Sequence, residues 1–150
     1  MARIFWDTNF PMELRAVIEP YFEQFKMIVP TWCELIHVYY DRERGSATNN
    51  TQEDYRFATI TFEAGFIDQP EWKRRIDVLH EMIHIVLDPI HTQLLDLKNL
   101  FAQEEEYEKY IAEQIKHSIE RTTTDLTYCV DNLMKIIEER QSLPIEVSRR

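Results

Sequence analysis

The segment from residue 68 to residue 88 constrains the fold most, because it carries signals for the start, the period and the end of one helix. Asp68 and Glu71 have the spacing of a capping box, in which an acid follows the N-cap by three residues. Apolar residues then recur at helical spacing over 72–86, and Pro89 predicts the end of the helix. Towards that end the segment is apolar almost all round. We therefore expect a helix that is buried on several sides.

Two histidines and a glutamate interrupt this apolar segment, in the order His80-Glu81-Met82-Ile83-His84. On a helix, residues four apart project from one face about one turn apart. Both imidazoles can therefore reach one zinc ion, at ~2.0–2.1 Å from each nitrogen. Burying these ionisable groups without a partner would be costly, and a metal removes that cost. The sequence thus predicts Zn²⁺ held by His80 and His84, with Glu81 beside the ion as a general base.

The segments before this helix predict an α+β fold. Apolar residues at helical spacing indicate a helix over 11–27, which Pro20 should kink or break. Segments 31–42 and 55–62 have the composition and alternation of strands, and the polar stretch 43–54 connects them. We therefore expect a small antiparallel sheet packed on helices.

A long helix should follow the motif helix, from about residue 107 to residue 140, with a break around 122–124 as one alternative. This helix matters because a catalytic zinc ion usually has three protein ligands and a water, and the motif supplies only two. Acids near its start and along its length are candidates for the third ligand: Glu104, Glu105, Glu106, Glu108, Glu113 and Glu120.

The motif and its setting resemble the zincin metallopeptidases over residues 55–87. In the metzincin branch a third histidine lies six residues after the second, whereas His91 here is one place late, so that branch is disfavoured. The gluzincin branch takes a glutamate from a downstream helix instead. The resemblance to small bacterial and phage zincin-like proteins favours Glu120 as that ligand. Glu113, seven residues earlier on nearly the same helix face, is the main alternative.

The resemblance implies a zinc-dependent metallopeptidase that hydrolyses a peptide or protein substrate. His80, His84 and Glu120 would bind the metal, and Glu81 would act as the general base. An edge strand pairs with extended substrate in the zincin pattern, which makes 55–62 the candidate strand. An acid often orients a ligating imidazole, for which Asp77 and Asp125 are available. The residue that stabilises the oxyanion stays open among five candidates: Tyr107, Tyr110, His117, Arg121 and Tyr128.

Two other functions are compatible with the motif. One is a zincin-fold protein that binds zinc and recognises a partner without turnover. The other is a di-iron carboxylate bundle, since Glu81 and His84 also form half of the Glu-x-x-His motif of such bundles. Bundles need a second copy of that motif. The nearest pair, Glu113 and His117, is four residues apart rather than three, so this class is disfavoured.

Length and charge limit the remaining choices. A chain of 150 residues fits one domain, here 1–150 with residues 142–150 as a frayed tail. A net charge of −10 disfavours nucleic acid and anionic membranes as partners. No stretch approaches the ~20 apolar residues of a membrane span. The N-terminus lacks the apolar run of a signal peptide, and Cys33 and Cys129 are expected to be reduced core thiols, which predicts a cytoplasmic protein. The small size leaves a protein partner or a homo-oligomer open.

Overall fold

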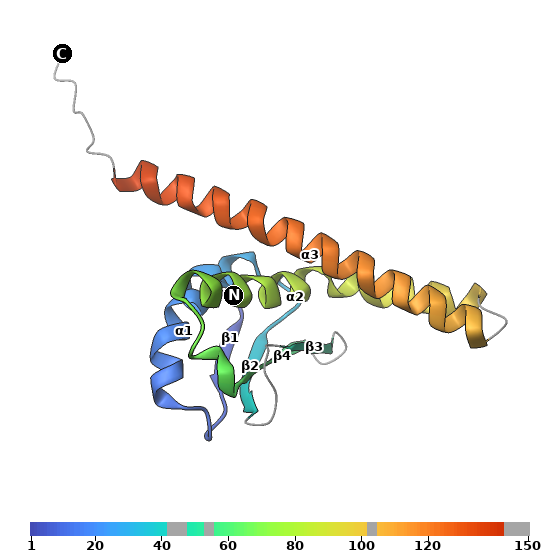
Figure 1. The fold of residues 1–150 in the computed structure, drawn as a ribbon, viewed down its shortest axis with the longest axis horizontal. Coiled ribbons are helices and arrows are strands. Elements are labelled where there is room, and N and C mark those ends of the chain that lie inside the picture. The colour runs from blue at the N-terminus through green and yellow to red at the C-terminus, as the bar shows by residue number, and fades with distance from the viewer. Residues whose placement is uncertain (42–47, 53–55, 102–104, 143–150) are drawn as a thin grey trace, which may run out of the picture.

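The computed structural model of the protein describes residues 1–41, 48–52, 56–101 and 105–142. Three α-helices and four strands make up these ranges (Figure 1). In chain order they are β1 (Arg3–Trp6), α1 (Met12–Phe25), β2 (Leu35–Asp41), β3 (Thr48–Gln52), β4 (Phe57–Glu63), α2 (Glu71–Phe101) and α3 (Glu105–Ser142). Two short 3₁₀ turns, Lys26–Ile28 and Ala64–Phe66, follow α1 and β4.

The sheet has the strand order β1-β2-β4-β3. β1, β2 and β4 run parallel, with Val38 opposite Ile60 in the central pair. β3 pairs antiparallel with β4 and forms one edge of the sheet. The predicted antiparallel sheet is therefore wrong, because the strands within 31–42 and 55–62 are parallel neighbours. Side chains alternate between the two faces of a strand in either direction, so the alternation in the sequence carries no information on strand direction.

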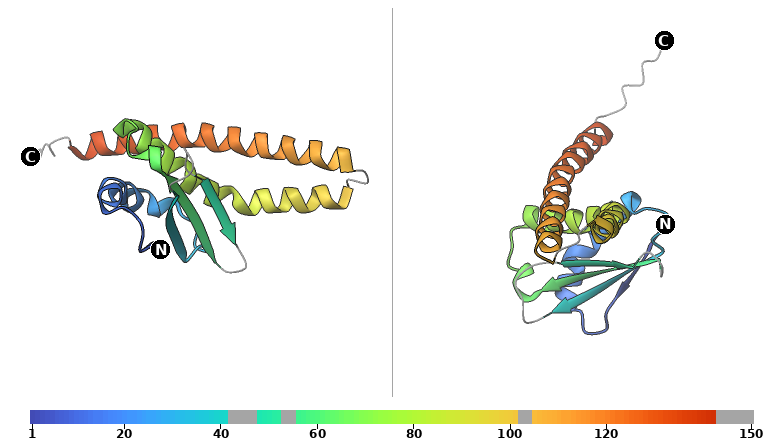
Figure 2. Two further views of the ribbon diagram at one scale, coloured as in Figure 1. Left: turned by 60° about the horizontal axis from the view of Figure 1, so that its bottom comes forward. Right: turned by 90° about the vertical axis from the view of Figure 1, so that its right-hand side faces the viewer.

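All three helices lie on one side of the sheet (Figure 2). The inner face of β4 contributes Ala58, Ile60 and Phe62 to a core cluster that also takes in α1 and α2. The Phe62 ring lies 6.0 Å from the ring of Phe22 in α1 and 4.6 Å from that of Phe66, measured between centroids. This apolar core holds α2 against the sheet and leaves another side of α2 for α3.

The helix boundaries differ from the predicted ones at several points. The Pro70 carbonyl accepts hydrogen bonds from the backbone N–H groups of Lys73 and Arg74, so Pro70 rather than Asp68 stands at the N-cap position of α2. α2 continues through Pro89 to Phe101, and the predicted end at this proline is wrong. A proline inside a helix removes one hydrogen bond at a cost of about 3 kcal/mol. Packing of α3 along α2 offsets that cost. α3 itself is unbroken through 122–124.

The second half of α2 and the first half of α3 form an antiparallel hairpin that extends beyond the sheet (Figure 2). Lys98 of α2 and Glu108 of α3 are joined across this hairpin by an ion pair of 2.8 Å. The two helices therefore stay paired well past the part of α2 that contacts the sheet.

Three further predictions concern membrane spans, the two cysteines and the C-terminal tail. Among the described helices, none is both long and apolar enough to cross a membrane. Cys33 is buried and Cys129 is exposed, and both are free, so the prediction of a core thiol is wrong for Cys129. Most of the predicted tail, residues 143–150, lies outside the described residues.

Candidate metal centre

His80 and His84 lie one turn apart on the side of α2 that faces α3. Their Nε2 atoms are 3.1 Å apart, and their ring centroids are 4.7 Å apart. The side chains keep 22% and 18% of their surface exposed. The helix thus directs both nitrogens at one point that is only partly open to water.

Glu120 of α3 completes this group. Its Oε2 lies 3.5 Å from Nε2 of His80, and its Oε1 lies 3.5 Å from Nε2 of His84. Within the described residues these three side chains form the one group of histidines, cysteines and acids whose donor atoms lie close enough to hold a metal ion, all within 4.8 Å of one another. The structure therefore brings together the three residues that the sequence predicted as ligands.

The spacing of the donor atoms fits a small tetrahedral ion. Ligands at ~2.0–2.1 Å from a tetrahedral zinc ion are about 3.3–3.4 Å apart. The two imidazole nitrogens are 3.1 Å apart, and the nearest Glu120 oxygen to each is 3.5 Å away, Oε2 for His80 and Oε1 for His84. The closest approaches between the three side chains are thus near the spacing of ligands around such an ion.

Two ion pairs fix the register of α3 on α2 on either side of the site. Arg75 and Asp131 are 3.1 Å apart towards one end, and Lys98 and Glu108 are 2.8 Å apart towards the other. Glu120 lies between Glu108 and Asp131 along α3, and its carboxylate oxygens face the two histidines.

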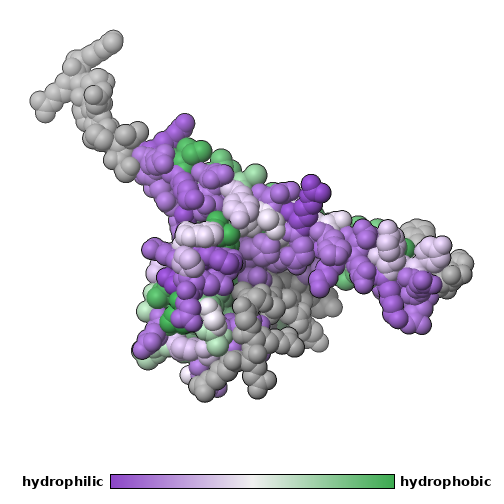
Figure 3. All heavy atoms as spheres, in the orientation of Figure 1, coloured by the Kyte–Doolittle hydropathy of each residue, from purple (hydrophilic) through white to green (hydrophobic). Residues whose placement is uncertain are grey.

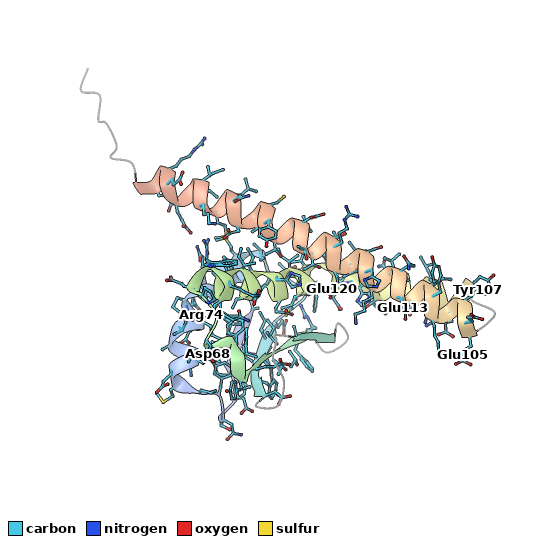
Figure 4. All side chains as sticks on the ribbon, viewed as in Figure 1. Asp68, Arg74, Glu105, Tyr107, Glu113 and Glu120 are labelled. Carbon is cyan, nitrogen blue, oxygen red and sulfur yellow. The ribbon has the colours of Figure 1, made fainter. Side chains whose placement is uncertain are left out.

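Glu113 is excluded as a third ligand by the same register. It lies two turns from Glu120, about 10 Å along the helix axis. Figure 4 shows it farther towards the connection between the two helices. The other candidate acids of α3 with described positions, Glu105, Glu106 and Glu108, lie farther still from Glu120 along α3, and Glu104 is outside the described residues.

The α3 surface that carries Glu120 continues as a column of buried polar side chains one turn apart, formed by Thr123, Thr127 and Asp131. The Thr127 hydroxyl donates to the Thr123 carbonyl oxygen at 2.7 Å. The Asp131 carboxylate pairs with Arg75 and also with Lys135, at 2.6 Å. Polar groups in this column are thus paired along α3 itself or across to α2.

Glu81 is nearly buried, with 6% of its surface exposed. Burial raises the pKa of its carboxyl from 4.5 to about 8, and the negative charges of Glu120 and Asp77 act in the same direction. In the protein without a metal ion, Glu81 therefore holds a proton at neutral pH. A cation at the neighbouring ligands would favour the ionised form, which is the form that accepts a proton.

His84 has a protein group near each of its ring nitrogens. Burial lowers the pKa of its imidazole, so the ring is neutral at neutral pH, which is the form that binds metal ions. Its Nε2 faces His80 and Glu120, while its Nδ1 lies 3.4 Å from the hydroxyl oxygen of Thr123. Sequence analysis missed this contact. In the sequence the contact is indicated only by a threonine about one helical turn after Glu120. A threonine at this spacing is too common in helices to indicate a contact with a histidine.

The acids that the sequence proposed for orienting an imidazole lie elsewhere. Both oxygens of the Asp77 carboxylate bind the Lys73 ammonium, at 2.9 and 2.8 Å. Asp125 is exposed. The five candidates for stabilising the oxyanion are exposed as well, and the structure favours none of them: Tyr107, Tyr110, His117, Arg121 and Tyr128.

No protein-family model, no curated protein and no solved structure matches this chain. Its function must therefore be inferred from the site itself.

Proposed function

We propose that this chain is a zinc-dependent metallopeptidase, with His80, His84 and Glu120 as zinc ligands and Glu81 as the general base. The observation that carries the proposal is the meeting of three side chains next to a buried carboxyl. Nε2 of His80 and Nε2 of His84 are 3.1 Å apart, and each lies 3.5 Å from one oxygen of the Glu120 carboxylate. Two histidines and a glutamate are a ligand set of zinc peptidases, in which a water takes the fourth position.

The helix motif, two histidines four residues apart with a glutamate beside the first, favours zinc over metals that prefer six ligands. Two histidines and one carboxylate also bind iron(II) in oxygenases, where neighbouring donors are about 3.0 Å apart for bonds of ~2.1 Å. The closest approaches of Glu120 to the imidazoles, 3.5 Å through each of its two oxygens, are nearer to the tetrahedral spacing, and the 3.1 Å between the imidazole nitrogens is nearer to the octahedral one. A bound zinc ion would supply Lewis acidity, polarising a carbonyl and acidifying a water.

The chain's own residues then have separate tasks. Glu81 takes a proton from the attacking water and returns it to the leaving amine, because its carboxyl is buried beside the ligands and exchanges a proton near neutral pH. His84 stays neutral through burial and so keeps a lone pair for the metal. The Glu120 side chain is 49% exposed, which leaves one side of the site open to a substrate.

The sheet offers a backbone edge for an extended peptide. The strand proposed for this task from the sequence, 55–62, corresponds to β4, which lies inside the sheet between β2 and β3. The edge nearest to it is β3, and among the described residues no strand pairs with its outer side. An extended substrate can add to such an edge through main-chain hydrogen bonds. We therefore assign this task to β3 rather than to β4.

Zinc binding without turnover is the second candidate, and one observation favours it. The C-terminal half of α3 carries exposed apolar side chains, among them Leu126, Leu133 and Ile137. Figure 3 shows hydrophobic patches along the outer edge of α3. Such a surface suits partner recognition. The two candidates differ over Glu81, which only an enzyme needs as a base.

The metal content of purified wild-type protein and three variants tests the proposal. We expect about one zinc per wild-type chain by mass spectrometry of the metal, and loss of zinc in Glu120→Ala. Glu113→Ala is the matched control, since it removes an exposed acid from the same helix, and it should keep its zinc. Zinc-free wild-type protein, or equal zinc in both alanine variants, would contradict the proposed ligand set.

Cleavage of an unfolded protein or a peptide library then separates the enzyme from the binding protein. Glu81→Gln should keep zinc and lose activity by roughly 10²–10⁴-fold, because a positioned general base contributes about that much. If zinc-loaded wild-type protein and Glu81→Gln cleave equally, or neither cleaves, the peptidase proposal is wrong and zinc binding without turnover stands.

A further inference from the structure

We propose that Thr123 is a positioning residue that accepts a hydrogen bond from the Nδ1–H of His84 and so directs Nε2 of that ring at the metal. This inference rests on the proposed function, because it concerns the same site. The Thr123 hydroxyl oxygen lies 3.4 Å from Nδ1 of His84, across the interface between α2 and α3.

The direction of this hydrogen bond follows from the other bond of the hydroxyl. Thr123 donates its own proton to the carbonyl oxygen of Ile119, at 2.9 Å. A hydroxyl has one proton and two lone pairs, so towards His84 it can only accept. Nδ1 of His84 must then carry the proton, which leaves Nε2 with the lone pair that a metal ion needs.

Burial protects this contact from competition by water. Thr123 has no exposed surface, and it lies between two packed helices. Water therefore competes little for the Nδ1–H group. The bond to Ile119 also fixes the rotamer of Thr123, since a helical threonine chooses between two rotamers partly by bonding the preceding turn. The acceptor is thus held in place before any ion binds.

The other ring nitrogen of His84 meets different groups. Nε2 faces Nε2 of His80 and Oε1 of Glu120. Metal-ligating histidines usually donate their second N–H to a carboxylate, a carbonyl or a water. Here a neutral hydroxyl takes that role, and it adds no negative charge beside Glu81 and Glu120. This choice suits a site that already holds two carboxyl groups.

Thr127 provides a matched control. It is also buried, it lies one turn farther along α3, and its hydroxyl makes the same kind of bond, to the carbonyl of the residue four positions earlier. Thr123→Val and Thr127→Val therefore lose equivalent helix contacts, whereas only Thr123→Val removes the acceptor for His84. Thr123→Ser keeps the hydroxyl and tests for rescue.

Zinc affinity, measured by competition with a chelator, is the first readout. We expect Thr123→Val to weaken zinc binding on the order of 10-fold, the lower end of the effect of such supporting contacts. Thr127→Val and Thr123→Ser should bind zinc as the wild type does. Thermal unfolding of the zinc-free variants checks that the two valine variants are folded to the same extent.

The second readout is the imidazole N–H proton of His84 in the zinc-loaded protein, observed by ¹H–¹⁵N nuclear magnetic resonance. In wild-type protein, Thr123→Ser and Thr127→Val we expect slow exchange of this proton with water. In Thr123→Val it should exchange faster, because the acceptor is gone.

Each outcome bears on one proposal. If wild-type protein binds no zinc, the proposed function fails. If wild-type protein binds zinc and Thr123→Val binds it equally well, the role of Thr123 is refuted while the zinc site stands. Equal weakening in both valine variants, or failure of Thr123→Ser to rescue, would mean that packing rather than the hydroxyl is responsible, and would also refute that role.

Discussion

The two sides of α2 differ in what they bury. The side in the core cluster presents apolar side chains, among them Val78, Met82 and Ile85, all fully buried. The side towards α3 carries His80 and His84 and meets the polar column of α3. One side therefore stabilises the fold through area removed from water, and the other places a few polar atoms at defined distances. A helix that does both must be held from two directions, by the sheet and by α3.

This contrast separates stability from site geometry in a way that experiments can check. A substitution that shortens a side chain on the apolar side should reduce the free energy of unfolding and leave the zinc affinity of the folded protein nearly unchanged. A substitution on the polar side should reduce the zinc affinity and change the free energy of unfolding less. The following predictions run from the largest expected effect on stability to the smallest.

The largest effect is expected from Ile60→Ala, which removes a fully buried side chain of β4 from the core cluster. We expect a loss of about 2–5 kcal/mol in the free energy of unfolding, because a cavity adds to the lost burial. Urea denaturation of the zinc-free protein measures it. Thr59→Ala, on the outer face of the same strand, is the control and should change stability much less. A large fall in zinc affinity of folded Ile60→Ala would contradict the separation of the two sides.

The next effect is the pH dependence of the free energy of unfolding of the zinc-free protein. Folding raises the pKa of Glu81 from 4.5 to about 8, so the folded state holds more protons than the unfolded state between these values. The stability from this group is therefore complete below pH 4.5 and falls as the pH rises towards 8, by up to about 1.4 kcal/mol per unit. Glu81→Gln should lose this slope and be more stable than wild type at pH 8. Urea denaturation in a chelator at several pH values tests it, and parallel slopes for the two proteins would contradict it.

A smaller loss of stability is expected from Asp131→Asn, which keeps the shape of a buried side chain and removes its charge. Arg75 would lose the ion pair that fixes the register of α3, at a cost of about 1–3 kcal/mol. Zinc affinity should fall more than in Ile60→Ala, since Glu120 depends on that register. Asp125→Asn, an exposed change on the same helix, is the control. Unchanged zinc affinity in Asp131→Asn would show that the register is set elsewhere.

The smallest effect is expected from Lys98→Gln, which breaks the ion pair with Glu108 in the hairpin. The lysine side chain is largely covered while the glutamate is half exposed, so the pair is partly screened by water and salt. Thermal unfolding at low and high salt measures it, and the difference between variant and wild type should shrink as salt rises. A loss larger than that of Asp131→Asn would place the main register contact in the hairpin instead.

Part of the site could be predicted from the sequence because it is local. His80, Glu81 and His84 belong to one helix, and helical geometry alone places the two imidazoles on one face. The third ligand could not be chosen in this way. Glu113 and Glu120 share nearly the same helix face, and the choice depends on how far α3 slides along α2. The resemblance favoured Glu120, and only the packed structure shows which glutamate meets the histidines.

The sheet and the helix ends were harder to predict for a related reason. Alternation marked β2 and β4 as strands, but their direction depends on which edges pair, and β3 occupies one edge of β4. Pro89 predicted a helix end because a proline costs one hydrogen bond. The prediction was wrong because contacts with α3, distant in the chain, offset that local cost.

The sequence by itself determined the His80–Glu81–His84 motif and the helix that presents it, since hydrogen bonds and side-chain period within one helix depend on neighbours a few residues away. Only the tertiary structure decided the parallel sheet, the position of Glu120 and the contact between Thr123 and His84. Each of these depends on the register of segments far apart in the chain, and that register is set by the buried core together with a few ion pairs such as Arg75–Asp131.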